Sequence, residues 1–188
     1  MTRTLFSLLI LLTLIATPAM ATTVMKVDVP TMTQTSEWVV RAHVTEIRNV
    51  DLRREGKGFF TDVDLTITEV YRGQNVPERY TMRMIGGHGA DGLNLWIPGM
   101  PRFRTGDESV LFLERTSAGH IPCGLGQGVW RVRADLKGNA WVTQGGQGMH
   151  LVRRDHTGRL APAHQPPLTS VHLLHDLVTE IYAAQQVE

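Results

Sequence analysis

The feature that most limits how this chain can fold is an alternation of apolar and polar residues over Phe60–Tyr71. A period of two residues matches a β-strand with one buried face, whereas a helix would scatter the same apolar side chains around its axis. We therefore expect a half-buried strand with Asp62 and Asp64 on its solvent face. Its inward-facing residues are expected to be Val63, Leu65 and Ile67.

Several other segments have strand patterns. Ser36–Val50 also alternates, and the charged, glycine-containing segment between it and Phe60 predicts a long hairpin. The continuous apolar run in Ser109–Glu114 indicates a central strand. One face of Ser36–Val50 is expected to hold Val40, Ala42, Val44 and Glu46. The remaining expected strands are Arg79–Ile85, Gly128–Ala134 and Ala140–Gln144, and the last two form a hairpin with its turn at Lys137-Gly138.

One helix is expected, over Thr169–Gln185, after a proline-containing linker at residues 156–168. Its N-cap is Thr169 or Ser170. Because no helix separates the strands, we expect a mainly β fold over residues 22–155: an OB-like antiparallel five-stranded barrel with an extra hairpin. The C-terminal α-helix is expected to pack on this domain through a stripe of Val171, Leu174, Leu177, Val178 and Ile181.

The amino-terminal segment, residues 1–21, has the pattern of a cleaved signal peptide. Arg3 precedes the apolar run Leu5–Ala16, and small residues at Ala19 and Ala21 favour cleavage after Ala21. As a helix the apolar run would cover only about 18 Å, which is short of a ~30 Å hydrocarbon core. The pattern therefore predicts export to the periplasm or the medium, with no transmembrane anchor in the mature chain.

The charge balance argues against a nucleic-acid partner. The 188 residues include 19 Lys and Arg against 18 Asp and Glu, a net charge of +1, and nucleic-acid binding usually requires a basic excess. The single cysteine, Cys123, permits no intramolecular disulfide and no multi-cysteine zinc site. The sequence lacks the phosphate-loop and dinucleotide-binding motifs, so no cofactor is expected.

Catalytic patterns are weak. The segment nearest to a serine-hydrolase elbow, Gly124–Gly128, has no serine at the nucleophile position. Asp62 and Asp64 point the same way from one strand, but carboxylates are commonplace on a solvent face. His120 lies close to Cys123 in the sequence, yet the apolar surroundings of this cysteine favour a small buried thiol.

The longest irregular stretch, Gly86–Glu108, contains most of the candidate binding residues. Its glycines and prolines argue against a helix, and loops of this length are often functional. In one interpretation it is a recognition surface, whose candidates are His88, Asp91, Trp96 and Arg102. In the other it is a lid that covers one end of the barrel with Leu93, Leu95, Trp96, Ile97 and Phe103. We favour the lid, because a secreted protein rarely leaves so many apolar residues uncovered.

Trp141 is a further candidate binding residue. If the turn before it takes three residues, Trp141 shares a face with Arg131 and Arg133 and forms a cation–π recognition patch. If the turn takes two residues, Trp141 shares a face with Ala134 and belongs to the core. The pattern leaves both alternatives open.

The eight histidines raise the question of a metal. The only close pair is His172 and His175, which are i and i+3 on the expected helix with Asp176 adjacent, and this is a weak candidate site. His88 with Asp91 in the glycine-rich loop is another. Solvated histidines are the usual finding, so no metal is expected.

Three segments carry a resemblance to known proteins: SEWVVRAHV (36–44), TDVDLTITEVYRG (61–73) and PRFRTGDESVLFL (101–113). Their outline is similar to small secreted bacterial proteins of mostly uncharacterised function, and to the netrin-like and tissue-inhibitor-of-metalloproteinase module. The resemblance covers about residues 35–132 and implies an OB-type β-barrel. The inhibitors of that family chelate a protease zinc through an amino-terminal cysteine. Because the only cysteine here is Cys123, the resemblance does not imply inhibition.

These observations favour a non-enzymatic exported binding module that presents the Gly86–Glu108 loop to a protein or glycan of the envelope or medium. The alternative is a metal-binding protein or an enzyme that uses surface histidines. The missing nucleophile, phosphate and metal motifs favour the binding module.

Overall fold

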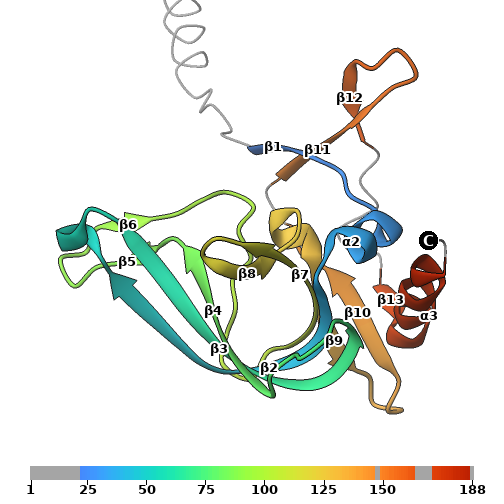
Figure 1. Cartoon of the computed structure of the whole chain (residues 1–188), viewed down its shortest axis with the longest axis horizontal. Coiled ribbons are helices and arrows are strands. Elements are labelled where there is room, and N and C mark those ends of the chain that lie inside the picture. Colours follow the sequence, from blue (N-terminus) through green and yellow to red (C-terminus); the bar gives the residue numbers. More distant parts are fainter. Residues whose placement is uncertain (1–21, 147–148, 164–170, 187–188) are drawn as a thin grey trace, which may run out of the picture.

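The computed structural model describes residues 22–146, 149–163 and 171–186. The expected signal segment and the expected helix N-cap at Thr169 or Ser170 lie outside these residues. The fold is mainly β, as predicted, with α-helices at α2 (Val29–Thr35) and α3 (Leu174–Gln185) (Figure 1).

The largest sheet has the strand order β13-β10-β9-β7-β2-β3-β4, and β8 also pairs with β7. All of its pairings are antiparallel, and they include both predicted hairpins. Its strands are β2 (Trp38–Asp51), β3 (Phe59–Arg72), β4 (Arg79–Ile85), β7 (Glu108–Thr116), β8 (Gly119–Pro122), β9 (Val129–Ala134), β10 (Ala140–Gln144) and β13 (Val171–Leu173).

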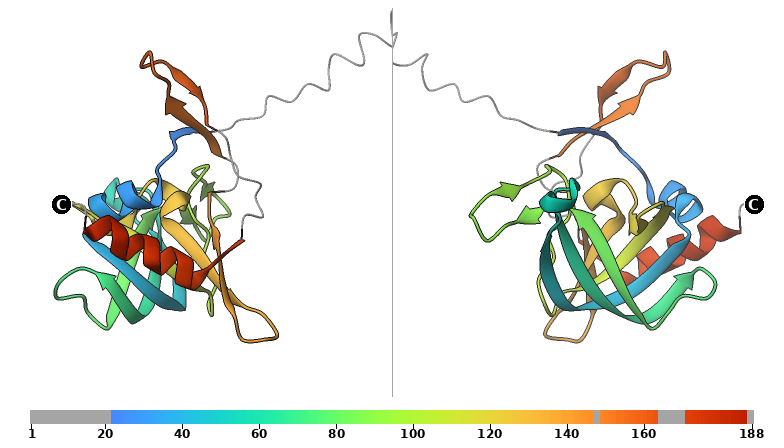
Figure 2. Two further views of the ribbon diagram at one scale, coloured as in Figure 1. Left: turned by 90° about the vertical axis from the view of Figure 1, so that its right-hand side faces the viewer. Right: turned by 60° about the vertical axis from the view of Figure 1, so that its left-hand side comes forward.

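Two smaller sheets lie beside it. The parallel pair β1 (Thr22–Met25) and β11 (Met149–Arg154), extended by β12 (Leu160–Pro162), projects from the rest of the molecule (Figure 2). Strand β12 falls inside the expected linker at 156–168. The pair β5 (Gly87–His88) and β6 (Asn94–Leu95) forms within the Gly86–Glu108 loop. Short 3-10 helices occur at η1 (Arg53–Glu55) and η2 (Leu125–Gly128).

No sheet closes into a barrel within the described ranges, so the expected five-stranded closed barrel is not confirmed. Strand β4 has a ladder only with β3, and the four-residue β8 has one only with β7. Side chains span the gap instead of a ladder. The hydroxyl of Tyr80 accepts a hydrogen bond from the backbone N–H of His120 at 2.8 Å.

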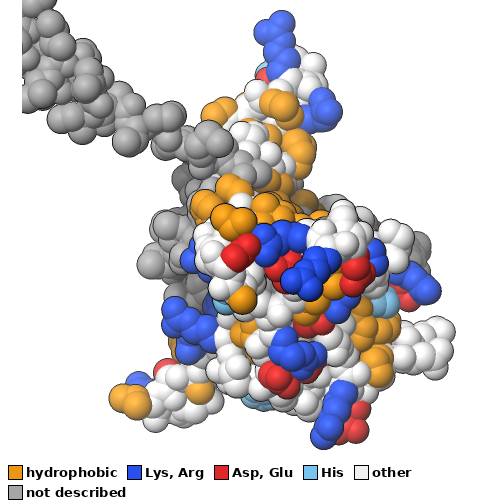
Figure 3. Space-filling model, turned by 90° about the vertical axis from the view of Figure 1, so that its left-hand side faces the viewer, with side chains coloured by type: hydrophobic (Ala, Val, Ile, Leu, Met, Phe, Trp, Pro, Cys, Tyr) orange, Lys and Arg blue, Asp and Glu red, His pale blue; other side chains and the backbone are white. Residues whose placement is uncertain are grey.

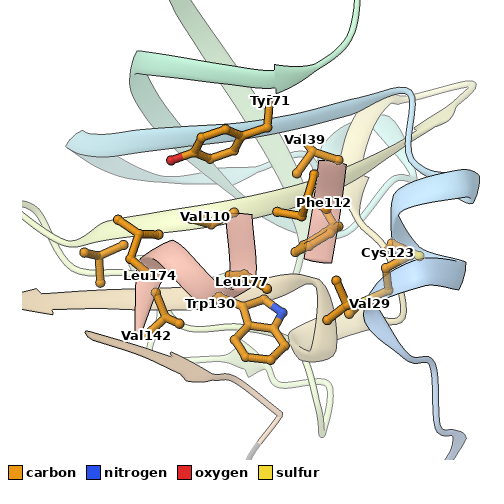
Figure 4. Packing of buried hydrophobic residues seen from close by; sticks show 13 residues of the cluster. Val29, Val39, Tyr71, Val110, Phe112, Cys123, Trp130, Val142, Leu174 and Leu177 are labelled. Atoms are coloured by element: carbon orange, nitrogen blue, oxygen red, sulfur yellow. The ribbon is translucent and has the colours of Figure 1, made fainter. Parts of the chain in front are cut away.

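Strand β7 lies in the middle of the sheet and is buried on both faces, as its continuous apolar pattern predicted. Val110 and Phe112 pack into an outer cluster that includes residues of α2 and α3, such as Val29 and Leu177 (Figure 4). The alternate residues of β7 face an inner cluster on the other side of the sheet. This strand therefore joins two cores.

The inner cluster confirms the best-patterned strand and corrects one residue of its neighbour. Val63, Leu65 and Ile67 of β3 are buried as predicted. Glu46 of β2 is exposed, although the alternation put it on the face of Val40, Ala42 and Val44. The register of β2 against β3 shifts between Val44 and Glu46, so a bulge turns Ile47 toward the cluster in place of Glu46.

The expected helix starts later than its pattern indicated. Val171–Leu173 form β13, which pairs with β10 along Trp141–Thr143, and α3 begins at Leu174. The strand satisfies the backbone groups at the edge of β10, and this pairing takes precedence over the helical period. The rest of the stripe is confirmed, because Leu174, Leu177 and Ile181 are buried and Val178 packs against them.

Replacing Leu65 by Ala should lower the free energy of unfolding by about 2–5 kcal/mol, because the change removes transfer energy and leaves a cavity in the inner cluster. Val70→Ala is the matched control on the same strand: Val70 is 45% exposed, and its loss should cost about 0.5 kcal/mol or less. Chemical denaturation measures both. Equal effects of the two substitutions would contradict the assignment of the inner face.

Candidate functional site

A pocket of about 430 Å³ lies between the Gly86–Glu108 loop and the β2-β3-β4 part of the sheet. Nine of its sixteen lining residues are apolar, five have polar side chains, and none is an aspartate or a glutamate. The aliphatic lining comprises Ile47, Met84, Ile85, Leu95, Ile97 and Met100. An apolar pocket with few polar groups is the usual form of a small-ligand site.

The first part of the loop is tied to the sheet by side chains of β2 and β3. Asn49 accepts a hydrogen bond from the backbone N–H of His88 at 3.1 Å, and the hydroxyl of Thr61 donates to the carbonyl of Gly86 at 2.8 Å. At Gly87 the backbone has a φ of +145°, and a Cβ there would lie 2.8 Å from the carbonyl oxygen of Phe60. The consecutive glycines therefore allow the loop to lie directly against the strands.

The end of the loop is tied by Arg131 of β9. Its guanidinium donates to a carboxylate oxygen of Asp107 at 2.6 Å and also to the backbone carbonyl of Arg102. The same oxygen of Asp107 accepts the backbone N–H of Arg104 at 2.8 Å. Because both ends are held, the loop presents its side chains with little ordering cost on binding.

The lid interpretation is wrong for the middle of the loop. Leu93 and Trp96 are each 58% exposed, and Leu95 is 40% exposed. Of the other two residues expected in the lid, Phe103 packs against the inner cluster, and Ile97 is half-buried in the lining of the pocket. The physical reason is that Met100 and Phe103 already pack on this cluster, while the β5-β6 pair holds residues 93–96 away from it.

The loop brings together three of its four candidate residues. His88, Trp96 and Arg102 line the pocket, and the guanidinium carbon of Arg102 lies 5.4 Å from the centre of the Trp96 ring. Asp91 is outside the lining and pairs with Arg53 at 2.8 Å. The hydrogen bond from this guanidinium lowers the pKa of the Asp91 carboxyl.

The surface on the side of η1, β5 and β6 carries charges of both signs. Acidic and basic side chains alternate over this face, and hydrophobic side chains form a band next to the projecting hairpin (Figure 3). No large single-sign patch therefore surrounds the loop in this view, which agrees with the nearly neutral composition.

Trp141 lies elsewhere, in the β9-β10 hairpin. It is opposite Arg133 in the ladder, so it shares the face of the arginines and not that of Ala134. Its indole N–H donates to the carboxylate of Asp135 at 3.2 Å. The side chain therefore braces the turn, and it does not line the pocket.

The remaining candidates are engaged in structural contacts. Asp62 is buried, against expectation, because Arg83 binds both of its oxygens, at 2.7 and 2.6 Å. Cys123 is buried as predicted, and burial raises the pKa of its thiol. Its sulfur lies 3.4 Å from the hydroxyl of Thr35, while His120 stacks on Trp38.

The histidine pair of the expected helix is split between two elements. His172 is in β13, where its ring lies 5.8 Å from that of Trp130, and His175 is in α3. The described residues contain no group of three or more His, Cys, Asp or Glu side chains placed to hold a metal. Asp176 thus has no such site to join in this part of the chain. None of the described helices is both long and apolar enough to cross a membrane.

Sequence reasoning did not identify the pocket residues of the sheet, Asn49, Thr61 and Met84. They belong to different strands, and their side chains meet only after β2, β3 and β4 have paired. Comparisons with protein-family models, curated proteins and solved structures find no match to this chain.

The hydrogen bond between Trp141 and Asp135 in the β9-β10 hairpin can be tested at acid pH. Hydrogen bonds from the Asn139 side chain, from the Trp141 indole and from the turn backbone lower the pKa of Asp135 to about 2. The stabilisation by this carboxylate is present above its ordinary pKa near 3.8 and is lost as the pH falls toward 2. We expect Trp141→Phe to raise the pKa of the Asp135 carboxyl, which NMR titration measures. An unchanged pKa would mean that the indole does not bind this carboxylate in solution.

Proposed function

We propose that the chain is an exported, non-enzymatic binding module that presents the Gly86–Glu108 loop and its pocket to a partner in the envelope or the medium. One observation carries this proposal: Trp96 is 58% exposed beside an apolar pocket, on a loop whose two ends are tied to the sheet. Exposed, rigidly held tryptophans are typical anchors of binding sites.

The energetics support a recognition role for this surface. Contiguous exposed apolar side chains are costly for a monomeric protein in water unless a partner covers them. Ile85 is 55% exposed and adjoins the same pocket, so the apolar surface includes the end of β4 as well as the loop. Of the two expected partner classes, a protein and a glycan, these exposed apolar side chains favour a protein, since the centre of a protein interface is apolar.

We also propose that residues 35–132 are related to the OB-type, netrin-like module. This relationship is supported by the antiparallel order β7-β2-β3-β4 around the inner cluster and by the predicted resemblance over residues 35–132. The closed five-stranded form of that module is not part of the support.

The loop is tested by Trp96→Ala. We expect the melting temperature to change little, since the ring is mostly exposed, and we expect a pull-down from the native envelope or medium to lose its partner. Trp141→Ala is the matched control, because it removes the same ring from outside the pocket and should leave the capture intact. A large drop in melting temperature for Trp96→Ala, or equal capture by both variants, would contradict the proposal.

Export is tested separately. The signal pattern of residues 1–21 predicts that the mature protein begins at Thr22. Amino-terminal sequencing of the protein from the periplasm or medium should find this residue first. Recovery of a chain with Met1 intact in a membrane fraction would contradict export by cleavage.

A further inference from the structure

We infer that the pocket beside the Gly86–Glu108 loop binds an aliphatic carboxylate, with its hydrocarbon chain between loop and sheet and its carboxylate at Arg102. This inference rests on the proposed function and adds to the protein partner of the loop a small ligand that the pocket holds. It is carried by the lining of the pocket, by the charge at its edge and by its size.

The lining suits a flexible hydrocarbon chain. Met84 of the strand β4 and Met100 of the loop contribute unbranched thioether side chains to the lining. Such side chains adapt their shape to a flexible apolar ligand. Isoleucine, leucine, proline and aromatic side chains supply the other apolar residues of the lining, so burial of the hydrocarbon is the main favourable term.

The charge at the edge of the pocket is positive and uncompensated. Among the residues that the structure describes, no carboxylate forms an ion pair with Arg102, whereas Arg53 and Arg131 are paired. The nearby acids Asp91 and Asp107 are engaged by those two arginines. A ligand carboxylate would therefore be the first anionic partner of Arg102.

The position of Arg102 is fixed by its neighbours. Its backbone carbonyl accepts a hydrogen bond from Arg131, and its guanidinium lies over the Trp96 ring. The donor groups of the guanidinium match the two oxygens of a carboxylate. His88 also lines the pocket, and the lining contains no carboxylate that would oppose an anion.

The size of the pocket favours a free small molecule. Its volume of about 430 Å³ lies within the range of about 300–1,000 Å³ usual for small-ligand sites. We therefore assign the site to a free aliphatic carboxylate, and an apolar carboxyl terminus of a protein becomes an outcome that the experiment must distinguish.

The test compares dodecanoate with dodecanol, which has the same chain and no charge, by calorimetry on the mature protein below the micelle concentration. We expect dodecanoate to bind at least about 5-fold more tightly than dodecanol, the size of a partly exposed ion pair of about 1 kcal/mol. Arg102→Gln should remove this preference. Arg104→Gln, in the same loop but outside the pocket lining, should preserve it. Trp96 fluorescence should shift on binding, and the shift should be absent in Trp96→Phe.

Several results would overturn the inference. Equal binding of dodecanoate and dodecanol, or equal effects of the two arginine substitutions, would mean that Arg102 does not bind the ligand carboxylate. The pocket would then be a site for the hydrocarbon chain alone. Binding of a hexapeptide with an apolar residue and a free carboxyl terminus, without binding of dodecanoate, would assign the site to protein termini. If no probe binds while Trp96→Ala still abolishes capture of the partner, the inference fails and the proposed function stands. If Trp96→Ala also captures normally, both fail.

Discussion

The burial of β7 on both faces is the constraint on which the rest of this structure depends. Val110 and Phe112 pack in the outer cluster under α2 and α3, while Leu111 and Leu113 pack in the inner cluster. All four side chains are fully buried, so neither core forms unless β7 lies between β2 and β9. The Gly86–Glu108 loop runs directly into this strand. The end of the loop is consequently fixed by the same packing that fixes the two cores.

The pocket follows from this arrangement, because the loop must travel from the end of β4 to the start of β7 across the open side of the curled sheet. Phe103 and Met100 pack on the inner cluster and so hold the second half of the loop down. The glycines at its start let the backbone lie against the strands, where Asn49 of β2 and Thr61 of β3 form hydrogen bonds with it. Between these two attachments the chain stands away from the sheet, and the space beneath it is the pocket.

Local patterns predicted the elements whose side chains alternate over many residues, such as β3, and the apolar centre of β7. They missed whatever depends on contacts made after the chain has folded. The bulge that exchanges Glu46 for Ile47 comes from the pairing of β2 with β3 and leaves no mark in the alternation. Val171–Leu173 continue a helical stripe, yet they pair with β10 because that edge is open to them. The loop candidates His88, Trp96 and Arg102 were found because aromatic and charged residues among glycines are visible in the sequence. Their partners on the strands, Asn49 and Thr61, have no such signal.

The exposure of Trp96 is the largest departure of the structure from the expected lid. Its reason lies in which apolar side chains of the loop the backbone allows to be buried. An apolar loop over an open sheet lowers its free energy by burying as many of these residues as its backbone permits. Here β5 pairs with β6, and the backbone hydrogen bonds of this pair hold Leu93, Leu95 and Trp96 at the rim, while Met100 and Phe103 pack on the inner cluster. Burial of apolar side chains alone does not account for a pairing that keeps a tryptophan largely in water. At its other end the hydrogen bond from Arg131 places Arg102 beside that ring, and no carboxylate of the described residues forms an ion pair with Arg102. An apolar pocket, an exposed ring and an uncompensated cation thus occur together on a backbone held at both ends, and this combination is what a ligand with an apolar body and a single negative charge requires.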